Sequence, residues 1–209
     1  MRAFHNDEKV QKMFLDRIHG HAKADDFIKG KYWEGGKGCA VGCSIHGSNH
    51  KDYETEMGVP EWLARVEDCF FENLPNEQSR LWPVQFMEAI NLGADLDKIK
   101  APFMIYILSQ SLLNFDHEKY PNVKKSIKDT IDLWEKHSEG PSAAESAAWS
   151  VARSAARSAA ESAARSAAWS ARSAAWSAES AARSAAWSAE SAAYIKYSEK
   201  LLELMRGCK

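Results

Sequence analysis

Residues 142–193 constrain the fold more than any other part of the sequence, because they repeat a Ser-Ala-Ala-X tetrad in which X is Glu, Arg or Trp. Alanine is the best helix former, and neither Gly nor Pro follows until Gly207. The repeat therefore predicts a helical scaffold rather than a catalytic site.

The phase of the repeat predicts a break in this helix. A period of four residues drifts by about 40° per tetrad, and from Glu161 onward three shortened tetrads bring the large side chains back onto one stripe. An unbroken helix over residues 142–205 would extend about 95 Å, which is too long for a compact domain of this size. We therefore expect a break at residues 157–161, with Trp169, Trp176 and Trp187 buried against the rest of the chain. The alternative is one protruding helix that pairs with a second copy.

Prolines mark the beginnings of the other predicted helices. Pro60, Pro83, Pro102 and Pro121 each precede an apolar pattern of helical spacing, and proline is favoured in the first turn. A further helix is expected after Asn6 or Asp7, ending near Gly20. The sequence predicts an all-α helical bundle with long Ser/Ala-rich C-terminal helices. Its segments are residues 1–58, 59–140 and 141–209, packed as one compact domain.

Composition narrows the classes of function. A net charge of −2 over 209 residues argues against a nucleic-acid-binding protein, which usually carries a basic face. The N-terminus has no apolar signal segment, and the longest apolar run, residues 102–108, is too short to span a bilayer. Four cysteines at irregular spacing do not form a secreted disulfide framework. We expect a cytoplasmic protein that binds neither nucleic acid nor membrane.

Two stretches carry a resemblance to known proteins. The first has an acidic residue after an aromatic one, then a proline, a basic helix that ends in an aromatic residue, and Ala-rich helices. This order of features resembles a family of immunity proteins from bacterial toxin systems. The positions that match are Phe115, Asp116, Pro121, Lys124, Lys125 and Trp134. In the N-terminal half, residues 37–43 and 58–65 resemble uncharacterised bacteriophage proteins. The resemblance implies a role in conflict between phage, host and toxin, and it supplies no catalytic residue.

The glycine-rich stretch, residues 35–50, carries the candidate site. Cys39, Cys43, His46 and His50 follow one another at spacings of four, three and four, and all are residue types that Zn²⁺ accepts. A buried thiol pair or ordinary loop cysteines remain alternatives. The backbone amides of residues 35–42, together with Lys37, suit a phosphate nest, and a flexible loop is the other interpretation.

The expected ligand site lies where this stretch meets the helix that begins at Pro60. Its predicted residues are Trp33, Lys37, Cys39, Cys43, His46, His50, Trp62 and Arg65. We expect a non-enzymatic binding protein that neutralises a protein toxin or sequesters a small, nucleotide-like signalling molecule, and that forms homo-oligomers through its Ala-rich helices. The alternative is a small metal- or cysteine-dependent enzyme with its site at residues 35–50, in which Cys39 and a nearby histidine act as nucleophile and base.

Overall fold

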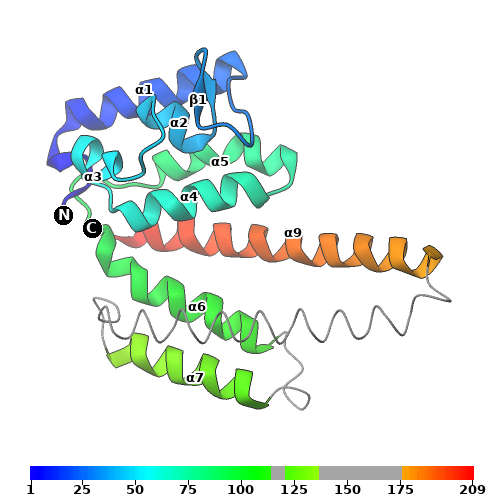
Figure 1. Ribbon diagram of the computed structural model, residues 1–209. Helices are drawn as coiled ribbons and strands as arrows, with labels where there is room; N and C mark the ends of the chain where they lie inside the picture. Colours follow the sequence, from blue (N-terminus) through cyan, green and yellow to red (C-terminus); the bar gives the residue numbers. More distant parts are fainter. Residues whose placement is uncertain (114–120, 137–175) are drawn as a thin grey trace. The chain divides into compact units, whose positions relative to one another are not determined.

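The computed structural model describes residues 1–113, 121–136 and 176–209, and it places the side chains of all of these except 176–188. The elements in chain order are the 3-10 helix η1 (Ala3–Asn6), helix α1 (Glu8–Ala24), strands β1 (Trp33–Glu34) and β2 (Lys37–Gly38), helices α2 (Ala40–Ile45), α3 (Asp52–Met57), α4 (Glu61–Asn73) and α5 (Asn76–Glu88), the 3-10 helix η2 (Leu96–Ile99), and helices α6 (Lys100–Leu113), α7 (Pro121–Lys136) and α9 (Trp176–Gly207). The fold is all-α, as predicted, with one short hairpin of two strands (Figure 1).

The chain forms two compact units. One comprises Met1–Ile99 together with Glu190–Lys209, and the other comprises Lys100–Ala189. These boundaries differ from the three expected segments, because α1 packs on α5 and α2 packs on α4. Residues on both sides of position 58 therefore share one hydrophobic core.

The core of the first unit follows the predicted amphipathic patterns. Asp7 caps α1 by accepting a hydrogen bond from the Lys9 amide at 2.8 Å, and the helix continues four residues beyond Gly20. Phe14 and Ile18 are buried as expected, whereas Met13 is 46% exposed. Burial of large side chains such as these is the main favourable contribution to folding.

The end of α9 is fixed to the first unit by apolar burial and by a cap. Leu201 and Met205 are fully buried. The side-chain amide of Asn91 donates to the carbonyl oxygens of Arg206 and Cys208, at 2.9 Å and 2.7 Å. Helix ends leave carbonyls without internal partners, so Asn91 satisfies groups that would otherwise need water.

The second unit contains the α6–α7 pair. These helices pack on each other, with Phe103 and Trp134 buried. The Lys100 ammonium lies 5.9 Å from the centre of the Trp134 ring, within the range of a cation–π interaction.

One predicted helix start is wrong. Helices α4, α6 and α7 do begin at or near Pro60, Pro102 and Pro121, but α5 follows Pro75 and contains Pro83 in its interior. Pro83 has no amide hydrogen to donate to the carbonyl four residues earlier, so its position in α5 is set by tertiary packing and not by local preference.

Helix α9 confirms that the repeat is helical from Trp176 onward. The expected break at residues 157–161 and Trp169 lie outside the described residues, and the side chains of Trp176 and Trp187, whose burial was expected, are not among those placed. None of the helices in the described part of the chain is long and apolar enough to span a membrane.

Candidate functional site

The glycine-rich stretch begins as a tight hairpin. Gly35 and Gly36 both have positive φ angles, 60° and 86°, and they connect β1 to β2 with Trp33 opposite Gly38. Two successive positive φ angles are typical of the two-residue turns that match strand twist, and glycine adopts them without strain. The stretch predicted as a loop is therefore a hairpin followed by helix α2.

Two further glycines allow the hairpin to lie directly on the beginning of α2. A Cβ atom at Gly38 or Gly42 would come within 1.9 Å or 1.4 Å of the Tyr32 carbonyl oxygen. Two of the backbone amides in this region are used inside the protein: that of Gly38 donates to the Asp26 carbonyl, and that of Cys39 to the Lys31 carbonyl. These amides are thus not available for the phosphate nest that the sequence suggested.

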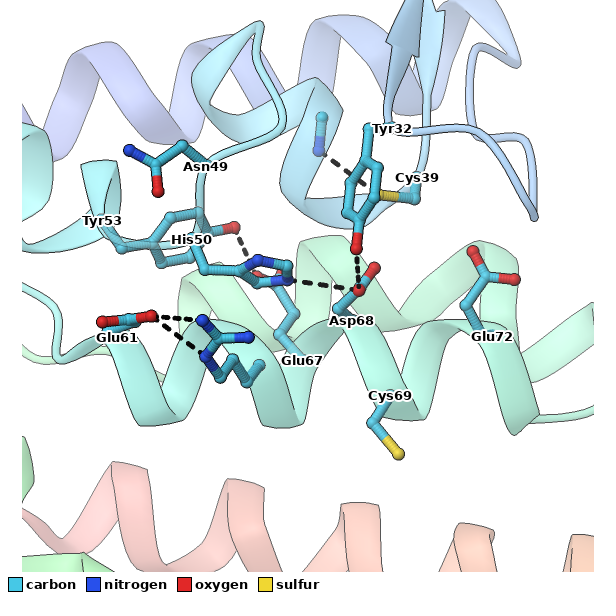
Figure 2. A network of polar contacts seen from close by, with 12 residues as sticks. Tyr32, Cys39, Asn49, His50, Tyr53, Glu61, Glu67, Asp68, Cys69 and Glu72 are labelled. Atoms are coloured by element: carbon cyan, nitrogen blue, oxygen red, sulfur yellow. Dashed lines mark hydrogen bonds and ion pairs between the residues drawn. The ribbon is translucent and has the colours of Figure 1, made fainter.

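A polar cluster lies where the hairpin meets α4, and we call it the Asp68 cluster: Tyr32, Cys39, His50 and Asp68. The Tyr32 hydroxyl donates to Asp68 Oδ2 at 3.4 Å, and His50 Nε2 lies 3.2 Å from the same oxygen (Figure 2). The two rings meet edge to face at 5.6 Å. His50 is 8% exposed and Tyr32 is 44% exposed, so the cluster extends from the protein interior to the surface. The negative charge of Asp68, followed by burial, raises the pKa of Tyr32.

Asp68 belongs to the polar face of α4. Glu61, Arg65, Asp68 and Glu72 recur at spacings of four, three and four and therefore form one stripe along the helix. Arg65 Nε donates to Glu61 at 3.0 Å, and Glu72 accepts a hydrogen bond from the Gly30 amide at 2.9 Å. Because Glu72 and Asp68 both hold the segment that leads into the hairpin, α4 fixes the position of Tyr32.

Beneath Asp68 lies a fully buried carboxyl group, that of Glu67. Its Oε2 accepts a hydrogen bond from the Tyr53 hydroxyl, and within the described part of the chain its Oε1 has no partner. Burial raises the pKa of Glu67 from its ordinary value of 4.5 to about 8, and the nearby Asp68 charge acts in the same direction. Glu67 is therefore mostly protonated at neutral pH. Burial also raises the pKa of Tyr53 well above its ordinary value.

The two thiols of this region are not activated. Cys39 Sγ accepts a hydrogen bond from the Gly42 amide at 3.5 Å, and both Cys39 and Cys43 are buried. Burial raises the pKa of Cys39 strongly and that of Cys43 to about 12. Nucleophilic cysteines require a lowered pKa, so the geometry does not support either residue as a nucleophile.

A second group of polar side chains lies between α1 and the hairpin, and we call it the His46 cluster: His21, Asp26, Trp33, Lys37 and His46. His21 Nδ1 is 3.0 Å from Asp26 Oδ2, and His21 Nε2 is 3.0 Å from His46 Nε2. The Trp33 ring stacks on His46 with centroids 4.4 Å apart, and Lys37 Nζ lies 3.7 Å from Asp26 Oδ1.

The four predicted zinc ligands do not converge. Cys39 and His50 belong to the Asp68 cluster, whereas His46 faces His21. Spacings of four, three and four would share one face only of a continuous helix, but α2 contains only Cys43: Cys39 is its N-cap, and His46 ends it with a left-handed φ of 52°. Among the described residues, no group of three His, Cys, Asp or Glu side chains could hold a metal ion.

The eight predicted ligand residues are divided in the same way. Cys39, His50 and Arg65 lie at or beside the Asp68 cluster, Trp33, Lys37 and His46 form part of the other cluster, and Cys43 is buried. Trp62 lies elsewhere, with its indole donating to Asp97 at 3.1 Å.

Sequence reasoning missed the acidic pair Glu67–Asp68, although a signal was present. Leu63, Glu67 and Phe70 recur at spacings of four and three on the apolar face of α4. A carboxylate at such a position must be protonated or paired when the helix packs, and it is thus a candidate for special chemistry.

No family model, no curated protein and no solved structure matches this chain. The interpretation of the site therefore depends on its own geometry.

Proposed function

We propose that this chain is a non-enzymatic binding protein that acts in the cytoplasm in conflict between phage, host and toxin, and that it sequesters a small, nucleotide-like signalling molecule at the Asp68 cluster. The observation that carries this proposal is the Tyr32–Asp68–His50 chain of polar contacts, which leads from an exposed aromatic ring to a nearly buried imidazole. Binding sites commonly place a few oriented polar groups on a rigid support, here α4.

The chemistry of the cluster suits such a ligand. The exposed Tyr32 ring offers a face for stacking a base. Arg65 lies one helical turn before Asp68 on the same face of α4, and its side chain is 63% exposed and able to reach an anionic group. The partly exposed Asp68 carboxylate can accept from a hydroxyl or amino group.

The test is a thermal-shift screen of the full chain with mononucleotides, cyclic mononucleotides and cyclic dinucleotides, followed by titration calorimetry of any compound that stabilises it. A ligand at 100 times its Kd stabilises the folded state by about 2.7 kcal/mol, which is readily measured. We expect Asp68→Asn to abolish the shift and Glu77→Gln, which changes an exposed carboxylate on α5, to retain it. If no compound stabilises the wild-type chain, the nucleotide-like ligand is rejected.

The binding hypothesis would then leave a protein toxin as the ligand. It would be tested by the growth of cells that express a candidate toxin together with this chain or with Asp68→Asn. The proposed contact between copies through the Ala-rich helices falls largely on residues outside the described part of the chain.

One observation favours a second candidate, an enzyme that uses acid–base chemistry. Asp68 lies against one nitrogen of His50, and a carboxylate in that place orients an imidazole as a general base. Cysteine chemistry has no such support, because the thiol pKa values are raised. Chromatography of the same compounds after incubation with the protein separates the two candidates: turnover that His50→Ala abolishes would indicate an enzyme.

A further inference from the structure

The contact between His21 and His46 can hold only one proton. Two imidazole nitrogens 3.0 Å apart form a hydrogen bond when one carries a hydrogen and the other a lone pair. Asp26 accepts from His21 Nδ1, so in the neutral pair His21 Nε2 is the acceptor and His46 Nε2–H is the donor.

The ring geometry distinguishes a shared proton from a shared metal ion. The ring centroids are 5.2 Å apart while the facing nitrogens are 3.0 Å apart, so each ring extends almost directly away from the contact. Ligands of one metal ion point instead toward a common third atom, at about 2.0 Å from each nitrogen, and their rings would be closer together. The arrangement is that of an N–H···N hydrogen bond.

Protonation affects this contact in two steps. A first proton is tolerated, because His21 can then donate to His46 and pair with the negative charge of Asp26. A second proton leaves both nitrogens as donors and brings two positive rings into contact. That state has no hydrogen bond and is repulsive at this distance.

Charged groups of both signs lie around the pair. On α1, Arg17 donates to the Ser44 carbonyl at 2.6 Å, near the end of α2. On the hairpin, Lys37 faces Asp26, while Glu34 pairs with Lys31. Asp26 is thus the carboxylate in direct contact with the pair. Burial, then Arg17 and then His21 lower the pKa of His46.

We propose that Asp26, His21 and His46 form an acid-released clasp that fixes the β1–β2 hairpin to α1. Trp33 stacks on His46 and meets the edge of His21 at 5.4 Å, so the hairpin is attached to both members of the pair. Opening of the clasp frees Trp33. It also loosens the neighbouring Tyr32, which would weaken ligand binding at the Asp68 cluster; that last consequence rests on the proposed function.

The experiment follows Trp33 in the full chain without any ligand. The protein is labelled with 5-fluorotryptophan, the Trp33 fluorine resonance is assigned with Trp33→Phe, and spectra are recorded from about pH 8 to about pH 4.5, on either side of the ordinary histidine pKa. We expect the wild-type resonance to move as the pH falls below about 6.5. It should stay in place in His46→Asn, which carries no titratable ring and tolerates the left-handed backbone at this position.

His19→Asn is the matched control, because His19 lies on the same helix and faces Glu88 at 3.2 Å. The Trp33 resonance of this variant should move with pH as it does in the wild type. If His46→Asn fails to fold, as judged by circular dichroism at pH 8, His46→Gly replaces it with the same expected result, because glycine carries no titratable ring and adopts the left-handed backbone. A wild-type resonance that does not move, or a transition that persists in His46→Asn or His46→Gly, would overturn the clasp. Because no ligand is present, either result leaves the proposed binding function to its own test.

Discussion

The Asp68 cluster and the His46 cluster share one hairpin but differ in what supports them. Tyr32 reaches α4 in the first cluster, and its neighbour Trp33 contacts His46 in the second. Beneath Asp68 lies the fully buried Glu67, whose proton is retained up to a pH of about 8. The His46 cluster instead brings two imidazoles into direct contact, and burial lowers the pKa of His46. This difference underlies the two proposals, a fixed recognition surface on one side of the hairpin and a releasable attachment on the other.

Among substitutions that test this difference, Gly42→Ala is expected to have the largest effect, because it should disturb both clusters together. A Cβ atom there would lie 1.4 Å from the Tyr32 carbonyl oxygen, so the hairpin must move away from α2. We expect a loss of about 3 kcal/mol or more in the free energy of unfolding, measured by urea denaturation.

Gly20→Ala is the control for this substitution, because no atom lies within 4 Å of a Cβ built at Gly20. Within α1 it should stabilise the protein by roughly 0.5 to 1 kcal/mol. Equal effects of the two substitutions would show that the hairpin does not lie closely on α2.

A stability effect with a distinct pH dependence is expected from Glu67→Gln. The pKa of Glu67 rises from 4.5 to about 8 on folding, so the folded state binds the proton more tightly than the unfolded state does. The contribution to stability is complete below about pH 4.5 and is lost as the pH rises toward 8, with a slope of up to about 1.4 kcal/mol per pH unit. Glutamine does not titrate, so the stability of the variant should decline less over this range.

Urea denaturation of the wild type and of Glu67→Gln at several pH values measures this difference, and Glu77→Gln serves as the exposed control. A gap between wild type and Glu67→Gln that is constant with pH would mean that Glu67 is ionised in the folded protein at neutral pH.

The sequence predicted the all-α fold, but it did not predict which side chains of the candidate site lie in contact. Helical patterns and the Asp7 cap are local features, and they appear as expected. The pairing of His21 with His46 and of Tyr32 with Asp68 depends on the close approach of the hairpin to α1, α2 and α4, which no local pattern encodes. The four candidate zinc ligands are separated for a related reason, because the chain forms a cap at Cys39, a short helix and a reversal at His46.

The smallest effect expected is a difference in thiol reactivity, and it tests whether the Asp68 cluster is a binding surface or a cysteine site. Cys69 is exposed on α4, whereas Cys39 and Cys43 are buried with raised pKa values. Because the thiolate is the reactive species, native protein treated with iodoacetamide at about pH 8 should be labelled first at Cys69, as identified by peptide mass spectrometry. In Cys69→Ser the fast phase should disappear, with the remaining thiols labelled only as the protein opens. Labelling of Cys39 as fast as that of Cys69 would indicate an accessible thiolate beside His50, and it would favour a cysteine-dependent enzyme over the binding protein proposed here.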